Sequence, residues 1–457
     1  MSGMETKENK IKVGMIALGC NKNQVDAELM LGALSDKGFE IVEDAGDCDV
    51  IIVNTCGFIE SAKKESIESI LECCEMKKQG QVKLVVVTGC LAERYREEMA
   101  ELIPEADVIL GIGANDELAE SIKQALAGQA VRKFYAPENL VMEGKRILVN
   151  YPHYAYIRIA DGCDNRCAYC AIPMIRGRYR SRPMENIIEE CRHFAEKGVE
   201  ELIIIAQDTT RYGEDLYGKR MLPELFRQIC AIDGLRWVRI LYAYPERVTE
   251  ELLDTMASED KIVKYLDIPL QHCSKKVLKS MHRKASTSAE LLSMLKHIRE
   301  KVPGICLRTT LLTGFPGEND DDFEALCKFV KAAKFDRLGC FAYSREEGTP
   351  SYDMPNQLDE ETKDRRAEVI MKIQTEVSAA LQKKKIGKTY DVVVEGYDRK
   401  NKVFVGRTAQ DAPEIDGVVY FSSPEKHCIG DFVKVKIEKS SDYDLLGSLA
   451  EEQGGTE

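Results

Sequence analysis

The chain has 457 residues, enough for about three domains at ~150 residues each. Its 44% hydrophobic and 31% charged residues are typical of a globular protein and exclude the disordered and fibrous classes. The formal net charge of −13 argues against non-specific binding to nucleic acid, which depends on clustered Lys and Arg. The N-terminal MSGMETKENK lacks the apolar core of a signal peptide, and no apolar run approaches the ~20 residues of a membrane span. We therefore expect a cytoplasmic protein that is neither inserted in a membrane nor bound to one.

The first 130 residues alternate apolar runs with helical patterns. Buried strands are predicted at 12–18, 49–55 and 83–89, with helices between them at 25–38 and 60–78. This alternation is typical of βαβ units with a parallel sheet. We therefore expect residues 1–130 to form an open parallel α/β sheet domain.

A second α/β series is predicted at 154–386, after a linker at 131–153 that is rich in Pro, Gly and polar residues. Its six candidate strands are separated by helix-length stretches and lie at 154–160, 200–208, 235–245, 265–272, 304–314 and 337–344. Six consecutive β/α units indicate a partial TIM-like (β/α) barrel.

The pattern changes at Gly387. Residues 387–451 contain five short β-rich segments separated by turn residues, which indicate a small antiparallel β-barrel. The predicted fold class is therefore α/β, with an open parallel sheet, a partial barrel and a terminal β-barrel in that order.

Sixteen cysteines in a cytoplasmic chain argue for metal or redox chemistry rather than disulfides. Cys163, Cys167 and Cys170 form a C-x3-C-x2-C pattern directly after the first strand of the second series. Three thiolates on a short loop can bind three irons of a 4Fe–4S cluster and leave the fourth iron open. A structural zinc site is the alternative, and its nearest further ligands would be His153 and Cys191.

With Tyr169 beside the last cysteine, this motif resembles the signature of radical S-adenosylmethionine (SAM) enzymes. The resemblance implies that the open iron binds the amino and carboxylate groups of SAM. It also implies that one electron cleaves the bound SAM and releases a 5′-deoxyadenosyl radical. Tyr169 is then expected to lie at the cofactor.

Cys20, Cys56 and Cys90 each directly follow one of the three N-terminal strands. Loops at the carboxyl ends of parallel strands share one rim, so these cysteines could converge, and Gly19 and Gly89 permit close backbone approach. The residues alone leave open that the three are packing residues. The other ten cysteines, among them Cys73 and Cys74 on a predicted helix, are interpreted as packing residues.

The stretches GCNKNQVDAE, NTCGFIESAKKESI and TGCLAERY around these cysteines resemble the methylthiotransferase family of radical SAM enzymes. The resemblance extends from about residue 11 to residue 450. It implies that Cys20, Cys56 and Cys90 hold a second 4Fe–4S cluster, whose open iron carries the sulfur group to be inserted. It also implies that SAM is both the methyl donor and the radical source.

One branch of this family modifies an adenosine of transfer RNA, and the other modifies an aspartate of small-subunit ribosomal protein S-twelve. AQDTTRYG at 206–213 and GRTAQDAPEIDGVVYF at 406–421 resemble the ribosomal branch. Asn21 and Ala27 depart from it, since proline and serine are expected there. We therefore expect a methylthiotransferase that acts on the β-carbon of an aspartate of S-twelve, with a reducing electron donor as a further partner.

The terminal barrel resembles a TRAM domain, a module that often holds RNA. Residues 388–457 contain 9 Lys and Arg against 14 Asp and Glu, a net charge of −5. An acidic barrel suits a basic protein such as a ribosomal protein and argues against direct nucleic-acid binding. Phe404, Tyr420 and Phe421 could stack on bases, but such residues are more often core in a small barrel.

Four further residues are candidates for contacts with the cofactor. Tyr169 follows from the motif, while Gln207 and Gln271 end candidate strands, where polar groups line the pocket of a barrel enzyme. Arg308 lies on an otherwise apolar strand and could point toward the cofactor carboxylate, or it could form a structural ion pair. Arg176 could contact the cofactor or the substrate, or be solvated.

Three other functions compete with this one. A transfer-RNA methylthiotransferase would be favoured by a basic groove on the terminal barrel. A non-catalytic iron–sulfur carrier normally has four protein ligands per cluster, so the open irons argue against it. A plain radical methylase would not need the second cysteine triad.

Overall fold

The computed structural model of the chain describes residues 10–43 and 45–450. It divides into two units that are described separately here. Unit 1 contains the chain up to Val149 together with Asp161–Arg166 and Cys170–Arg180, and unit 2 contains the rest. Most of the N-terminal stretch MSGMETKENK lies outside the described residues, as does Glu451, the last residue of the predicted terminal barrel.

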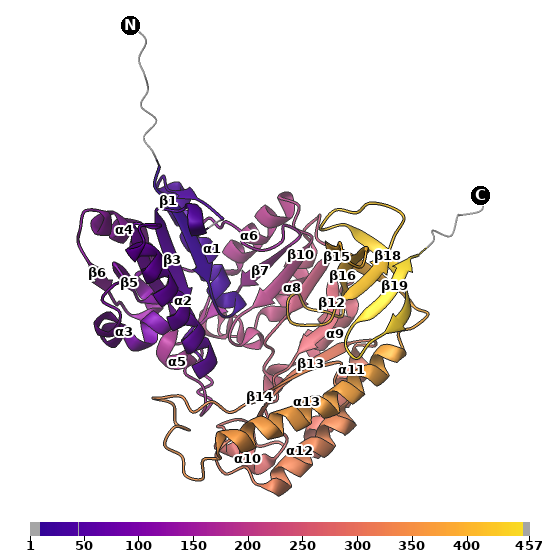
Figure 1. Cartoon of the computed structure of the whole chain (residues 1–457). Helices are drawn as coiled ribbons and strands as arrows, with labels where there is room; N and C mark the ends of the chain where they lie inside the picture. Colours follow the sequence, from indigo (N-terminus) through magenta and orange to yellow (C-terminus); the bar gives the residue numbers. More distant parts are fainter. Residues whose placement is uncertain (1–9, 44, 451–457) are drawn as a thin grey trace. The chain divides into compact units, whose positions relative to one another are not determined.

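Unit 1 is built on a six-stranded sheet with the order β2-β1-β3-β4-β5-β6, in which every pair is parallel (Figure 1). Its strands are β1 (Lys12–Ala17), β2 (Glu40–Ile41), β3 (Val50–Thr55), β4 (Leu84–Gly89), β5 (Val108–Leu110) and β6 (Val131–Lys133). Its helices are α1 (Asn21–Asp36), α2 (Glu60–Lys78), α3 (Cys90–Leu102), α4 (Leu118–Leu126) and the short α5 (Ile172–Ile175). Hydrophobic clusters cover both faces of the sheet, which explains why β3 and β4 are apolar runs without alternation.

The predicted open parallel sheet of the N-terminal domain is confirmed, with β1, β3 and β4 at the three apolar runs. The strands β2, β5 and β6 have only two or three residues, which is too short for a period to show in the sequence. β6 lies within the predicted linker 131–153, so this sheet extends beyond the predicted boundary at residue 130.

Unit 2 contains a second six-stranded parallel sheet, with the order β14-β13-β12-β11-β10-β7. Its strands are β7 (Tyr154–Arg158), β10 (Glu201–Ile205), β11 (Trp237–Ile240), β12 (Ile262–Asp267), β13 (Cys306–Thr313) and β14 (Arg337–Ala342). They overlap the six candidate strands of the predicted partial barrel, although β12 covers Ile262–Asp267 where 265–272 was predicted. The short strands β8 (Ala160–Asp161) and β9 (Arg180–Ser181) form a separate two-stranded sheet.

Helices alternate with the strands of this second sheet. They are α6 (Met184–Glu196), α7 (Glu214–Tyr217), α8 (Leu222–Cys230), α9 (Glu250–Ser258), α10 (Lys275–Ser280), α11 (Ser288–Lys301), α12 (Asp320–Ala333) and α13 (Glu360–Lys383). Two of them begin with a capping box that satisfies the free N–H groups of the first turn, Thr287 with Glu290 at α11 and Asn319 with Asp322 at α12.

The C-terminal strands close into a five-stranded barrel with the order β15-β16-β17-β19-β18. They are β15 (Thr389–Asp398), β16 (Val403–Thr408), β17 (Val419–Ser422), β18 (Phe432–Ser440) and β19 (Leu445–Leu449). The predicted barrel is confirmed, but β17 and β19 pair in parallel while the other pairs are antiparallel. Five strands cannot alternate direction all round a closed ring, so one parallel pair is unavoidable.

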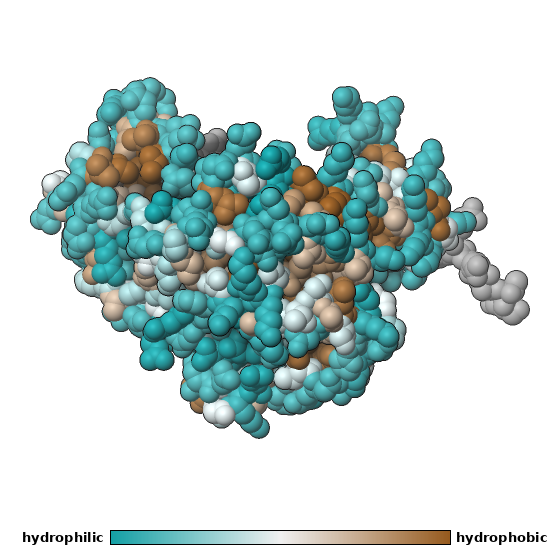
Figure 2. All heavy atoms as spheres, turned by 90° about the horizontal axis from the view of Figure 1, so that it is seen from below, coloured by the Kyte–Doolittle hydropathy of each residue, from teal (hydrophilic) through white to brown (hydrophobic). Residues whose placement is uncertain are grey.

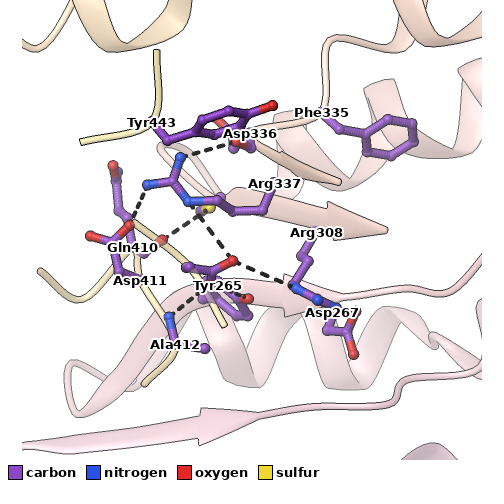
Figure 3. A network of polar contacts seen from close by, with 12 residues as sticks. Tyr265, Asp267, Arg308, Phe335, Asp336, Arg337, Gln410, Asp411, Ala412 and Tyr443 are labelled. Atoms are coloured by element: carbon purple, nitrogen blue, oxygen red, sulfur yellow. Dashed lines mark hydrogen bonds and ion pairs between the residues drawn. The ribbon is translucent and has the colours of Figure 1, made fainter. Parts of the chain in front are cut away.

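Within unit 2, the barrel contacts the second sheet through the docking loop, residues 409–416, which connects β16 to β17 (Figure 3). Arg337 at the start of β14 pairs with Asp411 of the loop. Tyr265 of β12 donates a hydrogen bond to Asp416 over 2.7 Å. Cys306 at the start of β13 donates to the Gln410 carbonyl. Arg337 and Cys306 each begin their strand, and Tyr265 is level with Cys306 in the pairing of β12 with β13. The loop therefore lies away from the carboxyl ends of β13 and β14.

The face drawn in Figure 2 is mostly hydrophilic, with hydrophobic side chains in separate small groups. Across the residues that the structure describes, no helix combines the length and the apolar character that a membrane crossing requires.

Candidate functional site

Cys20, Cys56 and Cys90 follow β1, β3 and β4, which are neighbours in the sheet of unit 1. Cys20 caps the N-terminus of α1, Cys90 is the first residue of α3, and Cys56 lies in the loop before α2. Because the three strands are parallel, all three cysteines lie at the same edge of the sheet. Cys20 is exposed, whereas Cys56 and Cys90 are buried.

Two glycines bring these cysteine loops together. A Cβ atom on Gly19 would lie 2.7 Å from Cβ and 2.8 Å from Sγ of Cys56, and Gly19 has a φ of +89° that other residues rarely adopt. A Cβ atom on Gly57 would lie 2.8 Å from the Cys90 carbonyl oxygen. The backbone beside each cysteine therefore touches the next cysteine along the edge, and any larger residue at either glycine would push the loops apart.

Side chains also fix the backbone of the same loops through hydrogen bonds. The Asn23 amide donates to the carbonyl of Leu18 over 2.7 Å, and the Asn54 amide donates to the Asn23 carbonyl over 2.8 Å. The Ser66 hydroxyl of α2 bonds to both the N–H and the carbonyl of Cys56, at 3.0 Å each. The cysteine positions are thus held by hydrogen bonds that do not depend on a bound group.

Burial raises the pKa of the Cys56 thiol and raises that of Cys90 to about 12, while Arg176 acts against the rise at Cys90. Burial alone would lower the pKa of Arg176, but Asp161 and Asp26 raise it well above its ordinary value. Arg176 is therefore charged, and a thiolate at Cys90 needs a metal ion or this cation beside it. The sequence left open whether Arg176 contacts a ligand or is solvated. In the structure its side chain is buried in unit 1.

Cys163 and Cys170 belong to unit 1, and Cys167 belongs to unit 2, so the second triad is described from each side. In unit 1, the Cys163 N–H donates to the Gly177 carbonyl over 3.2 Å, and the Asn165 N–H lies 3.5 Å from Cys163 Sγ. A Cβ atom on Gly162 would lie 2.0 Å from the Arg178 carbonyl oxygen. The two ends of the cysteine loop are therefore packed side by side, and the three cysteines stay within eight residues of chain.

In unit 2, Cys167 lies beside two aromatic residues and a buried cation. Cys167 Sγ is 3.8 Å from the Tyr244 hydroxyl. The Arg283 guanidinium lies 4.4 Å from the centre of the Tyr244 ring and donates to the Tyr169 hydroxyl over 3.4 Å. Burial raises the pKa of Tyr244, so its hydroxyl keeps its proton and can donate to a thiolate. Neither Tyr244 nor Arg283 was predicted from the sequence, because neither belongs to a motif with a characteristic spacing.

Gln207 and Gln271 both lie after the ends of their strands, as the sequence predicted. Gln271 has a φ of +70°, and its backbone bonds to β13 through Thr310 and Leu312. Arg308 makes ion pairs with Asp267 at 3.1 Å and with Asp416 of the docking loop at 3.6 Å (Figure 3). Arg308 therefore forms the structural ion pair that was the alternative to a contact with the cofactor. The docking loop that it contacts belongs to the terminal barrel.

The zinc alternative finds no ligand set. His153 lies 3.3 Å from Glu395, and Cys191 is fully buried on α6. Nowhere in residues 10–43 and 45–450 do three His, Cys, Asp or Glu side chains converge as ligands of one metal ion. Cys20, Cys56 and Cys90 lie on neighbouring loops at one edge of the sheet, and in a 4Fe–4S cluster each cysteine binds a different iron. The donor atoms and the glycine contacts at Cys20, Cys56 and Cys90 therefore fit such a cluster within unit 1.

The excess of acidic residues in the terminal barrel does not give it an acidic surface. Asp411, Asp416 and Glu395 are spent on ion pairs within unit 2, with Arg337, Arg308 and Arg407 respectively. Apart from the paired Glu395 and Asp416, the exposed or half-exposed acidic side chains of residues 388–450 are Asp391, Asp398, Glu414, Glu425, Asp431, Glu438, Asp442 and Asp444. The exposed basic ones are Lys388, Arg399, Lys400, Lys402, Lys426, Lys434, Lys436 and Lys439. The described barrel surface is therefore balanced, and its charge does not select a basic partner.

A groove of about 500 Å³ crosses the barrel and is lined in part by Tyr420, Glu438, Lys439 and Leu446. One acid and one base line it, so the basic groove expected of an RNA-binding barrel is not found at this position. Phe421 is fully buried and Phe404 nearly so, and their rings stack with centres 5.4 Å apart. Both are core residues, whereas Tyr420 reaches the groove.

Three family descriptions match consecutive parts of the chain. They are Uncharacterized protein family UPF0004 at residues 12–111, the Radical SAM superfamily at residues 157–330 and the TRAM domain at residues 386–449. Among solved structures, the radical S-adenosylmethionine methyltransferase TsrM from Kitasatospora setae has a TM-score of 0.56 at 16% identity and covers 84% of this chain and 80% of that chain. That likeness concerns the fold alone.

Together, the fold and these matches define a radical SAM enzyme with an N-terminal cysteine domain and a C-terminal TRAM barrel. A Clostridium botulinum (strain Hall) protein named ribosomal protein uS12 methylthiotransferase RimO is 49% identical over 445 residues, 97% of this chain and 99% of that protein. A Clostridioides difficile (strain 630) protein of the same name is 48% identical over 440 residues, 96% and 99% of the two chains. The chain belongs to the RimO family of radical SAM methylthiotransferases.

Proposed function

We propose that this chain attaches a methylthio group to the β-carbon of an aspartate of uS12, the ribosomal protein S-twelve of the sequence prediction, in the cytoplasm. The observation that carries the proposal is identity of 49% along 97% of the chain, on which all three family descriptions match. The charge of the barrel does not support this substrate, because acidic and basic side chains are balanced on its described surface.

The reaction needs a radical because the aspartate β-carbon carries an unactivated C–H bond, whose proton no side chain of ordinary pKa can remove at a useful rate. Bound at the two triads, 4Fe–4S clusters would supply reductive cleavage of SAM at Cys163, Cys167 and Cys170 and the sulfur group at Cys20, Cys56 and Cys90. The protein must hold the thiolates, orient the cofactor and exclude water. Tyr244, with its hydroxyl 3.8 Å from Cys167, supports one thiolate.

Three polar or aromatic residues of unit 2 are proposed to contact SAM. Tyr169 is held by Arg283, and its ring lies edge-on to Phe315 with centres 6.4 Å apart. Gln207 and Gln271 follow the carboxyl ends of β10 and β12, where enzymes with parallel sheets bind ligands. For Arg308 we favour the structural role, since two carboxylates already neutralise its charge.

The direct experiment is mass spectrometry of ribosomal proteins and of transfer RNA from cells with and without this gene. We expect the methylthio mass shift on uS12 to disappear without the gene and to return when the gene is restored. An unchanged uS12 together with loss of a methylthio group from transfer RNA would overturn the proposal in favour of the adenosine-modifying branch.

The roles of the triads are tested with the purified, reconstituted chain. Replacing Cys20, Cys56 and Cys90 by alanine should abolish methylthiolation but leave formation of 5′-deoxyadenosine after reduction. Replacing Cys163, Cys167 and Cys170 should abolish both. The matched control is Cys73→Ala with Cys74→Ala, since both thiols are buried on α2 outside the triads and both reactions should persist. Product from the first variant would refute the division of roles, and absence of 5′-deoxyadenosine from the parent would favour an electron carrier.

A further inference from the structure

Arg176 connects the two cysteine loops that belong to unit 1. It follows Cys170 by six residues, directly after α5. Ile175 of α5 packs with Ala171 against Cys90 in a buried hydrophobic cluster. This packing brings the end of the radical SAM cysteine loop onto a cysteine of the N-terminal triad, and it buries the Arg176 side chain to 1% exposure.

The Arg176 guanidinium has three partners. Nη2 donates to Asp26 Oδ2 over 2.7 Å and lies 3.5 Å from Cys90 Sγ. Nη1 donates to Asp161 Oδ2 over 2.9 Å, and the other oxygen of Asp161 accepts from the Gly162 N–H over 2.6 Å. Both carboxylates are fully buried. One cation and two anions are therefore fixed next to a cysteine that is expected to bind iron.

Charges in this position act strongly on the cysteine. Salt does not screen a buried pair as it screens a surface pair, and the effective dielectric constant is well below that of water. A cation near a cluster ligand stabilises the reduced cluster, which carries one more negative charge, and an N–H···S hydrogen bond acts in the same direction. A nearby carboxylate has the opposite effect.

We propose that Arg176 is a positioning residue that raises the reduction potential of the cluster held by Cys20, Cys56 and Cys90, and that Asp26 lowers it. The inference rests on the proposed function, because it takes those three cysteines as ligands of a second cluster. Arg176 touches one of these ligands but, among the contacts described in unit 1, reaches the other cysteine loop only through Asp161. Its effect is therefore on the N-terminal cluster first.

The test is an anaerobic redox titration followed by electron paramagnetic resonance on the full-length, reconstituted chain. Cys163, Cys167 and Cys170 are replaced by alanine, so that only the N-terminal cluster gives a signal. In this background, Arg176→Gln should lower the ratio of reduced to oxidised cluster at a fixed poised potential by tenfold or more, which corresponds to about 59 mV for a one-electron couple. Asp26→Asn should shift the ratio in the opposite direction.

Two further variants separate this effect from general disruption. Arg176→Lys keeps the charge and should shift the ratio less than Arg176→Gln does. Arg146→Gln is the matched control, since Arg146 is equally buried in unit 1 and pairs with Glu28 over 3.1 Å. It should destabilise the protein without moving the potential. If Arg176→Gln does not fold, the opposite shift in Asp26→Asn still decides the question.

The outcomes also distinguish this inference from the proposed function. A background protein that takes up no 4Fe–4S cluster would refute the second cluster itself. A background protein with a cluster whose potential is the same in the parent, Arg176→Gln and Asp26→Asn would refute the role of Arg176 alone. Shifts of equal sign in Arg176→Gln and Asp26→Asn would show disruption rather than electrostatics and would also overturn the inference.

Discussion

Glu201 carries a charge at a point that water does not reach. It lies at the start of β10, where Arg239 Nε is 2.8 Å from Oε1, and Arg407 of β16 pairs with the other oxygen. Burial alone would raise the pKa of Glu201, but Arg407 and Arg239 hold it below the ordinary value. The carboxylate is therefore ionised, and it joins the terminal barrel to the second sheet.

We predict that Glu201→Gln costs about 3–5 kcal/mol at pH 7, because it leaves the buried Arg239 without its anion and leaves Arg407 with Glu395 alone. The measurement is denaturant unfolding followed by the fluorescence of Trp237, the single tryptophan. The control is Glu251→Gln, whose exposed pair with Arg227 at 3.1 Å should be worth less than about 1 kcal/mol.

The same substitution has a predictable pH dependence. A carboxyl whose pKa is lowered by folding contributes stability that is complete above its unfolded pKa of about 4.3 and is lost as the pH falls through the folded value. The difference between the parent and Glu201→Gln should therefore shrink below pH ~4.3. A difference that stays constant down to pH 3 would contradict the ionised state.

Residue-level prediction from sequence is most specific where a residue type has one dominant use. Cys163, Cys167 and Cys170 carry their function in their spacing. The role of Arg308 was ambiguous, because an arginine on a strand can pair with a carboxylate of the protein or of a ligand. Its partner Asp416 is 108 positions away in the chain. No local pattern reports a contact of that kind.

At the scale of the element, the docking loop holds two aspartates with opposite titration behaviour. Burial raises the pKa of Asp416. Burial would also raise that of Asp411, but Arg337 and Lys385 bring it below the ordinary value. The loop thus depends on the negative charge of Asp411, while Asp416 also holds it by accepting hydrogen bonds from the Tyr265 hydroxyl and the Ala412 N–H.

We predict that Asp411→Asn destabilises unit 2 by about 3 kcal/mol or more, and Asp416→Asn by about 1 kcal/mol. Trp237 reports on this directly, since its ring lies edge-on to Phe432 of β18 with centres 4.8 Å apart. Detachment of the barrel should move its emission to longer wavelength in Asp411→Asn at lower denaturant. Equal effects of the two substitutions would contradict the pKa directions.

The elements themselves were largely predictable. The buried strands β3 and β4 are evident as continuous apolar runs, and the β-rich segments after Gly387 are long enough to show alternation. The short strands β2, β5 and β6 were missed because pairing with a neighbour, rather than their own composition, makes them strands. The predicted linker therefore begins at residue 131, although residues 131–133 form β6. The docking loop is marked in the sequence only by its resemblance to the family.

At the scale of the whole molecule, the terminal barrel is not an independent appendage of unit 2. The docking loop and Arg407 place charged groups of the barrel against buried groups at Glu201, Arg308 and Arg337. Removing the barrel would take Asp411 from Arg337, one of two partners from Arg308 and one of two from Glu201. Burying a charge that has lost its partner costs several kcal/mol.

We predict that the barrel and the second sheet unfold together. In hydrogen exchange, amides of β15–β19 and of β10 and β11 should open with the same free energy and the same denaturant dependence in the parent. In Asp411→Asn the barrel amides should exchange faster than those of the sheet. Independent opening of the barrel in the parent would contradict this coupling.

The docking loop also limits how specificity can be engineered in this family. Grafting a foreign terminal barrel onto this chain would present three arginines, Arg239, Arg308 and Arg337, to a loop selected to match other partners. A functional chimera must therefore exchange the barrel together with the strand starts that receive it. The part of the molecule that can be exchanged as one piece is then the barrel together with these strand starts, which a boundary drawn between matched domains would cut in two.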